Sequence, residues 1–88
     1  MKVEFRSSFV RDLNSVRDKA ILRRVREIIE RAEQTKSSTE IPNLKRLKGS
    51  GNYSRIRVGE YRIGVVLKGD DITFVRFLHR REIYRYFP

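Results

Sequence analysis

Three strand-like segments follow one another between residues 53 and 84, and this stretch constrains the fold more than any other. Apolar and polar residues alternate in residues 53–58 and 61–68, whereas residues 72–79 are nearly all apolar, as in a strand buried on both faces. We therefore predict an antiparallel meander, which brings residues that are distant in sequence close together. The two tight turns between the strands are Gly59–Glu60 and Gly69–Asp71.

The first half of the chain predicts a short strand followed by two helices. Residues 2–6 alternate apolar and polar side chains, as a strand does. From Phe9 to Val16, apolar residues recur at the spacing of one helix face, and Ser7 or Ser8 is the expected N-cap. The second helix starts at Asp18, as its N-cap or first-turn anion. Its apolar stripe consists of Ile21, Val25, Ile28, Ile29 and Ala32.

The opposite face of the second helix is charged, and we interpret it as a solvated surface. Arg23, Glu27 and Arg31 follow one another at intervals of four residues, so two ion pairs are expected between them. The apolar stripes of the two helices then cover one side of the sheet as a helical hairpin.

Less regular segments join or follow these elements. Residues 34–42 are a polar connector, residues 43–48 predict one helical turn, and Gly49–Gly51 predicts a flexible loop. Residues 80–88 are expected to form a short helix or tail over the sheet edge. The elements together predict a single α+β domain over residues 1–88. It has two layers, built from an N-terminal strand, a helical hairpin, a three-stranded antiparallel meander and the short C-terminal helix or tail.

The composition excludes several classes of site. The chain has no cysteine and one histidine, so neither disulfides nor a transition-metal site built from protein ligands is expected. No segment has the apolar length of a signal peptide or a membrane span. We therefore expect a cytoplasmic protein that binds no metal, no small-molecule cofactor and no membrane.

The net charge of +10 lies mostly in the second half of the chain. Residues 1–41 carry 10 basic and 7 acidic groups, whereas residues 42–88 carry 11 and 4. Proteins with such a charge bind polyanions by releasing counterions, so nucleic acid is the first partner to consider.

Strand alternation places arginines on one face of the predicted sheet. Arg55 and Arg57 share a face with Tyr53, whereas Ile56 points to the opposite face, toward the helices. Arg62 of the next strand falls on the same side as Arg57. We call this side the arginine face. Because arginine is almost never fully buried without a partner, this face is either solvent-exposed or a binding site.

Two sequence blocks in the second half of the chain carry a resemblance to a known family. The first is LKRLKG followed by YSRIRVGEYRIGVV, and the second is the closing HRREIY. In their order and spacing they resemble the RelE/ParE superfamily of toxins from type II toxin–antitoxin pairs. That superfamily shows a Leu-(Lys/Arg)-Gly step, a basic strand, a Tyr-Arg pair opening the next strand and an (His/Lys)-Arg…Tyr ending. The resemblance covers essentially the whole chain.

The resemblance implies a toxin of one of two kinds. RelE-type members enter the ribosomal A site and cut the mRNA there, whereas ParE-type members inhibit DNA gyrase. The basic residues of the first meander strand in RelE-type members match Arg55 and Arg57, and the arginine of the next strand matches Arg62. This set favours the mRNA-cutting branch, since ParE-type members generally lack it. The family's C-terminal arginine falls on Arg80 or Arg81, and its late tyrosine falls on Tyr84 or, alternatively, Tyr86.

RNA cleavage through its own 2′-OH needs cations at the phosphate, a base and an acid, but no metal. Arginine suits the first role, because its charge is permanent and its fork matches phosphate oxygens. The same permanence makes it a poor base, and RelE-type members have lysines where this chain has Arg55 and Arg57. The candidate base is then His79 or Tyr84, although each could equally have a structural role.

The expected partners are mRNA, the ribosome and a cognate antitoxin with an acidic segment that folds on binding. A non-catalytic RNA-binding domain is a further alternative. Side chains that we expect to contact ribosomal RNA or the antitoxin without taking part in chemistry are Lys45, Arg46 and Lys48. Tyr53 could stack on an RNA base or, equally, cap the core.

Overall fold

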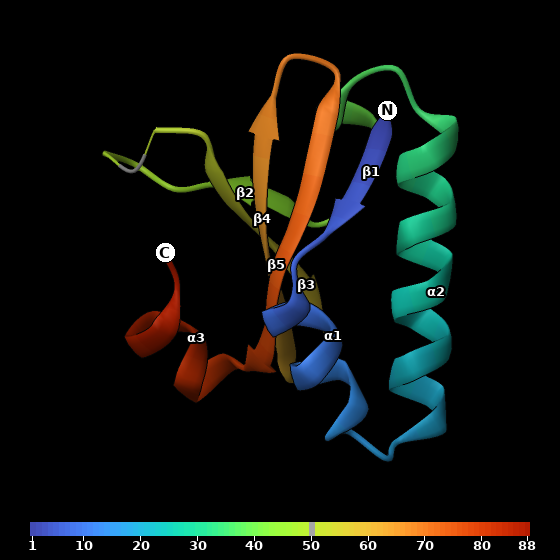
Figure 1. Cartoon of the computed structure of the whole chain (residues 1–88), viewed down its shortest axis with the longest axis vertical. Helices are drawn as coiled ribbons and strands as arrows, with labels where there is room; N and C mark the ends of the chain where they lie inside the picture. The colour runs from blue at the N-terminus through green and yellow to red at the C-terminus, as the bar shows by residue number, and fades with distance from the viewer. Residues whose placement is uncertain (50) are drawn as a thin grey trace.

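Five strands form one mixed sheet in the computed structural model of the chain, which describes residues 1–49 and 51–88 (Figure 1). The strand order is β1-β5-β4-β3-β2, so β1 and β2 form the two edges. β1 runs parallel to β5, and the other neighbouring strands are antiparallel. The strands are β1 (Lys2–Phe5), β2 (Leu44–Arg46), β3 (Tyr53–Val58), β4 (Tyr61–Lys68) and β5 (Asp71–His79).

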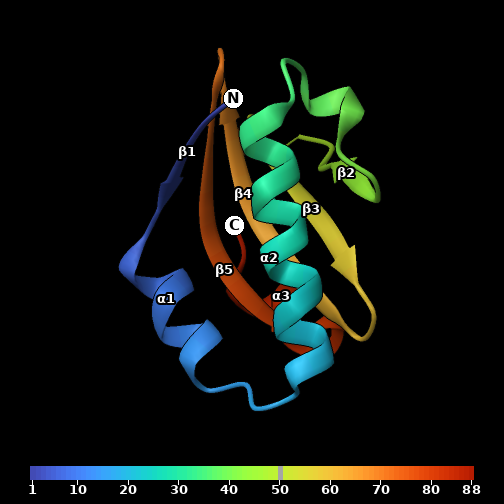
Figure 2. The ribbon, with the colours of Figure 1, turned by 90° about the vertical axis from the view of Figure 1, so that its right-hand side faces the viewer.

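Two helices lie on one side of the sheet and a third lies on the other. Figure 1 shows α2 (Lys19–Gln34) to the right of the strands, α3 (Arg80–Tyr86) to the left, and α1 (Ser7–Asn14) below β1. In Figure 2, α2 lies in front of the strands and α3 behind them. The α+β architecture predicted from the sequence is confirmed. The prediction that residues 80–88 lie over the sheet edge is wrong, because this segment packs on the sheet face opposite α2, with Phe87 against Gly64 of the interior strand β4. No helix within the described residues is both long enough and apolar enough to span a membrane.

The main core lies between the sheet and the α1–α2 hairpin. Ile56 and Ile63, which face each other across β3 and β4, are fully buried. Phe9 of α1 packs against Phe74 of β5, with the ring centroids 5.4 Å apart. The predicted division of β3 and β4 into a core face and an arginine face is therefore confirmed. Further buried members of this core are Val25, Ala32, Ile41, Val58, Val65, Ile72 and Phe77.

A β-bulge in β5 decides which of its side chains reach the core. Gly64 of β4 pairs with Arg76, but the next residue of β4 pairs with Phe74, so Val75 is an extra residue in β5. The bulge lets Phe74 and Phe77 both face the core, although three positions separate them. The prediction that this strand is buried on both faces is wrong, because its other face carries the half-buried Arg76.

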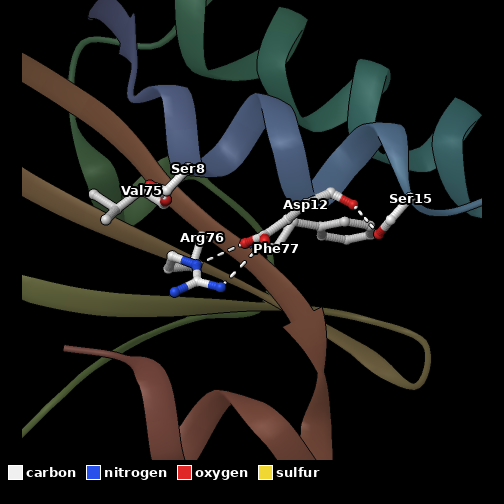
Figure 3. Close-up of polar contacts among 6 residues, drawn as sticks. All are labelled: Ser8, Asp12, Ser15, Val75, Arg76 and Phe77. Atoms are coloured by element: carbon white, nitrogen blue, oxygen red, sulfur yellow. Dashed lines mark hydrogen bonds and ion pairs between the residues drawn. The ribbon is translucent and has the colours of Figure 1, made fainter.

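Side chains of α1 continue the hydrogen bonding of β5 beyond the end of β1. Strand β1 pairs only with Asp71–Phe74, which leaves the later part of β5 without a neighbouring strand on that side. There the Ser8 hydroxyl donates to the Val75 carbonyl at 2.6 Å, and Asp12 Oδ2 accepts from the Phe77 N–H at 3.0 Å (Figure 3). Helix α1 thus satisfies backbone groups that would otherwise need a sixth strand.

Helices α1 and α2 differ in how their N-termini are capped. Asp18 accepts hydrogen bonds from two backbone N–H groups in the first turn of α2, at 3.0 and 3.2 Å, and is the N-cap that the sequence predicts. The predicted Ser7 or Ser8 cap of α1 is wrong. Arg6 holds the N-cap position without a side-chain cap, whereas Ser7 and Ser8 lie inside the helix and the Ser8 hydroxyl donates to β5.

Asp12 also forms an ion pair with Arg76. Arg76 Nε donates to Asp12 Oδ2 at 2.7 Å and Nη2 donates to Oδ1 at 3.2 Å, while only 11% of the Asp12 side chain is exposed (Figure 3). These hydrogen bonds raise the pKa of Arg76. In contrast, the ion pairs predicted among Arg23, Glu27 and Arg31 do not form within residues 1–49 and 51–88. All three residues are exposed, as the predicted solvated face requires.

The segment predicted as a helical turn, residues 43–48, instead contains β2. Leu44 pairs with Ile56, so this short strand extends the sheet beyond β3. Pairing satisfies backbone groups of β3, which would otherwise form an open edge, and one helical turn would not. The loop predicted at Gly49–Gly51 includes Ser50, which lies outside the described residues.

Candidate functional site

A hollow of about 400 Å³ opens on the arginine face, between β2, the two following strands and α3. We call it the arginine hollow. Three arginines come from β3 and β4, a lysine comes from β2, and a tyrosine comes from α3. The residues that line it are Asn43, Leu44, Lys45, Arg55, Arg57, Arg62 and Tyr84.

The strand register concentrates positive charge in this hollow. Arg57 lies directly opposite Arg62, and Lys45 lies directly opposite Arg55. Like charges that face each other across strands destabilise a sheet. Within the described residues, no carboxylate forms an ion pair with any of these four cations. An uncompensated cluster of this kind is a ready site for an anion.

Local hydrogen bonds hold the guanidinium of Arg62 at the β3–β4 turn. Its Nη1 donates to the carbonyl oxygens of Gly59 and Tyr61, both at 2.9 Å. The other guanidinium nitrogens make no hydrogen bond within residues 1–49 and 51–88. Arg62 is therefore oriented by the backbone while it keeps donors that can bind phosphate oxygens.

Helix α3 places Tyr84 at the mouth of the arginine hollow. The guanidinium carbon of Arg55 lies 4.4 Å from the centre of the Tyr84 ring. This is the geometry of a cation–π contact. The Tyr84 side chain is otherwise open, with 72% of the residue exposed. A phenol hydroxyl and an arginine cluster thus meet at one opening.

A second hollow of about 360 Å³ adjoins the first and shares Arg62 and Tyr84 with it. Its other lining residues are Arg80 and Arg81, so both candidates for the C-terminal arginine reach this region. Arg80 Nε pairs with Glu60 at 2.8 Å. Arg81 has no ion-pair partner among the described residues, and its guanidinium is therefore the more available of the two.

His79 occupies a structural position at the start of α3. Its Nδ1 accepts a hydrogen bond from the Arg81 N–H at 3.2 Å, as an N-cap does, and its ring meets that of Tyr61 edge-on with centroids 5.8 Å apart. His79 lines neither hollow. Of the two candidate bases, the structure brings only Tyr84 together with the arginines.

The side chains predicted to contact RNA or the antitoxin are separated by the structure. Lys45 lines the arginine hollow. Arg46 is exposed and donates to the Gly51 carbonyl at 3.3 Å, and Lys48 is exposed. Tyr53 is half-buried, and its ring packs edge-on against Phe87 with centroids 5.4 Å apart.

Two lining residues, Asn43 and Leu44, were not predicted, because their segment was interpreted as a helical turn. Asn43 has a φ of 65°, in the left-handed region, and its carbonyl accepts from the Arg57 N–H at 3.2 Å. Asparagine enters this region more readily than most residues. Its place between Pro42 and Leu44 was the available sequence signal for a turn followed by a strand.

No three His, Asp or Glu side chains gather at one place among the described residues, where they could share a metal ion. Glu60 forms its ion pair with Arg80, which lines the second hollow. What the site offers a ligand is guanidinium, ammonium and phenol groups.

A family model described as the ParE toxin of type II toxin–antitoxin systems, parDE, matches residues 3–84 of the chain. The chain belongs to this toxin family. Toxin RelE3 of Methanocaldococcus jannaschii is 47% identical over 89 residues, which span 100% of both proteins. Putative toxin RelE1 of the same organism is 33% identical over 91% of the chain and 89% of the relative.

Solved structures agree with this assignment. The toxin matches a chain in the crystal structure of the RelB-RelE antitoxin-toxin complex from Methanococcus jannaschii with a TM-score of 0.83 and 45% identity, over 97% of this chain and 99% of the other. A chain of the archaeal RelE-RelB complex from Pyrococcus horikoshii OT3 matches with a TM-score of 0.72 and 25% identity, over 90% of this chain and 93% of the other. The predicted membership of the RelE/ParE superfamily, and of its RelE type, is confirmed.

Proposed function

We propose that this toxin is a ribosome-dependent endoribonuclease that cleaves mRNA in the A site and so stops translation. The observation that carries the proposal is the arginine hollow, where Arg55, Arg57 and Arg62 surround one opening together with the hydroxyl-bearing Tyr84. A binding surface needs the cations alone. Several cations that line one hollow beside a hydroxyl group able to transfer a proton fit catalysis of phosphoryl transfer better than binding alone.

The reaction would use the 2′-OH of the RNA as its nucleophile. The 2′ oxygen attacks the adjacent phosphorus and the bond from phosphorus to the 5′ oxygen breaks. The proton of the 2′-OH passes to a base, and the leaving 5′ oxygen takes up a proton from an acid. The products are a 2′,3′-cyclic phosphate and a free 5′-hydroxyl, and no step calls for a metal ion.

The arginines would hold the phosphate and stabilise the charge that develops on it. A well-placed donor at such a position contributes about 3–4 kcal/mol to lowering the barrier. Arg62 is the best oriented, because the Gly59 and Tyr61 carbonyls already fix its Nη1. Arg81, in the adjoining hollow, is placed to bind the same or the neighbouring phosphate. Tyr84 is the proposed proton-transfer group.

The proposed partners are mRNA, the ribosome and a cognate antitoxin. The structures from Methanococcus jannaschii and Pyrococcus horikoshii are RelE toxins in complex with RelB. By charge complementarity, we propose that the antitoxin presents an acidic segment to this toxin, whose chain has a net charge of +10.

Primer extension on a reporter mRNA in a reconstituted translation reaction tests the proposal. Wild-type toxin should cut only when ribosomes are present and in register with the A site, and Arg62→Ala should abolish the cuts. Arg26→Ala, an exposed arginine on α2, is the matched control and should cut like wild type. Cleavage without ribosomes, or equal cleavage by the Arg62 variant, would overturn this assignment.

A second candidate is inhibition of DNA gyrase, and the specific observation that favours it is the ParE family model. This activity would need binding to gyrase without chemistry on RNA. A supercoiling assay with purified gyrase separates the two. Loss of supercoiling while the mRNA stays intact would favour gyrase inhibition. Intact supercoiling with cleaved mRNA would favour ribonuclease activity.

A further inference from the structure

Three residues form a row across the arginine face where α3 packs against it. Arg55 of β3 pairs with Gly64 of β4, and Gly64 pairs in turn with Arg76 of β5. Two long cationic side chains therefore flank a position that has no side chain. The glycine leaves a gap in the sheet surface between them.

Phe87 fills this gap. A Cβ added at Gly64 would lie 2.6 Å from Cδ1 and 2.7 Å from Cγ and Cε1 of the Phe87 ring, so the ring rests directly on the glycine backbone. Phe87 is only 4% exposed, and the Tyr53 ring closes on it from the side. The Phe87 N–H donates to the Ile83 carbonyl at 2.9 Å, which ties the seated ring to the last turn of α3.

The two arginines of the row contact the tyrosines of α3. The Arg55 guanidinium lies 4.4 Å from the Tyr84 ring centre, and the Arg76 guanidinium lies 5.8 Å from that of Tyr86. The segment of α3 and Phe87 thus contacts the row at three points. The apolar contact of Phe87 with Gly64, which we call the seat of Phe87, lies between the two arginine–tyrosine contacts. Tyr84 itself is 72% exposed, so its own burial does not hold it in place.

We propose that Gly64 and Phe87 are positioning residues of the site. The seat of Phe87 on Gly64 fixes α3 so that Tyr84 lies against the Arg55 guanidinium at the mouth of the arginine hollow. The inference rests on the proposed function for what Tyr84 does there. The position of Tyr84, however, can be measured without any cleavage reaction.

Gly64→Ala is the direct test, since the added methyl group occupies the place of the Phe87 ring. In wild-type toxin, the Arg55 Nε–H resonance should carry a ring-current shift from Tyr84, identified by its loss in Tyr84→Ala. Gly64→Ala should abolish the same shift. Ribosome-dependent cleavage should fall about 10²-fold, as expected for a displacement of about 1 Å in a catalytic group.

A double-mutant cycle distinguishes loss of the Gly64–Phe87 contact from a general loss of stability. Phe87→Ala should lose the Arg55 shift by itself, and adding Gly64→Ala to it should cause no further change, because the clash needs the ring. Ile28→Ala, which removes part of a half-buried side chain packed against the core on the far side of the sheet, is the control. It should lower the Tm and leave the Arg55 resonance unmoved.

The outcomes are distinct for the two proposals. An unchanged Arg55 shift in Gly64→Ala, or an equal loss of the shift in Ile28→Ala, would overturn the positioning role. Loss of the shift in Gly64→Ala, together with a wild-type toxin that cuts no mRNA, would keep the positioning role and reject the ribonuclease.

Discussion

At the scale of single residues, the arginine hollow joins permanent cations to only two side chains that can exchange a proton. Arg55, Arg57 and Arg62 stay charged at any ordinary pH, so they bind phosphate but do not take up the 2′-OH proton. Tyr84 and Lys45 are the lining groups that can transfer one. The Tyr84 residue is 72% exposed, and the Arg55 guanidinium lies against its ring.

Tyr84→Phe should lower the single-turnover cleavage rate on programmed ribosomes by about 10²-fold, with ribosome binding unchanged, because it removes only the hydroxyl. His79→Asn is the matched control. Asparagine can cap α3 through its carbonyl oxygen, as His79 does through Nδ1, and should retain most of the rate. If His79→Asn lost as much activity as Tyr84→Phe, the histidine would be the base and this assignment of roles would be wrong.

Arg57→Thr should make the toxin more stable and less active. Arg57 and Arg62 face each other across β3 and β4 with like charge, and threonine suits a strand. We expect the free energy of unfolding to rise by about 0.5 kcal/mol at low salt, measured by urea denaturation, and cleavage to fall at least about tenfold. A loss of stability in this variant would show that Arg57 has a structural partner.

At the scale of elements, the sequence predicts what periodicity controls and misses what the sheet edges control. Alternation in residues 53–58 and 61–68 correctly places the arginines on one face, because one buried face fixes the register of a strand. The strand character of Leu44–Arg46 depends on the open edge of β3, and its own residues do not reveal it. The seat of Phe87 on Gly64 and the capping role of His79 depend on how α3 returns to the sheet, which no local pattern encodes.

Asp12→Asn should destabilise the fold by about 2 kcal/mol. The largely buried Asp12 carboxylate pairs with Arg76 and also accepts from the Phe77 N–H at the free edge of β5, and the substitution removes its charge. The hydrogen bonds with Asp12 raise the pKa of Arg76, so their contribution to stability is fully present below the pKa of an unfolded arginine and is lost only as the pH rises through the folded pKa. The difference between wild type and variant should therefore stay constant from about pH 6 to 9, as urea titrations can show. Ser15→Ala is the control, because the Ser15 hydroxyl makes only a solvent-exposed hydrogen bond, to the backbone carbonyl of Asp12.

At the scale of the whole molecule, the face that carries the hollow and the surplus of charge belong to the same half of the chain. Residues 42–88 supply β2 to β5 and α3, and with them every lining residue of both hollows. Residues 1–41 supply β1 and the hairpin that supports the sheet from the other side. One face of the molecule thus carries the proposed chemistry and the other carries the core.

Association with ribosomes should weaken steeply with salt. The logarithm of the association constant should fall linearly with the logarithm of salt concentration, and Lys45→Gln should reduce that slope by about one. Arg26→Gln, on the exposed face of α2, should leave the slope unchanged. Binding of wild type that does not respond to salt would contradict recognition of the RNA backbone.

Attack by the 2′-OH can be tested with a ribosome-bound mRNA that carries a single 2′-deoxy nucleotide on the 5′ side of the cut. The deoxy substitution should abolish the cut and leave toxin binding intact, and the all-ribose message should yield a fragment ending in a 2′,3′-cyclic phosphate. Cleavage of the deoxy message at an unchanged rate would contradict attack by the 2′-OH and, with it, the role assigned to the arginine hollow.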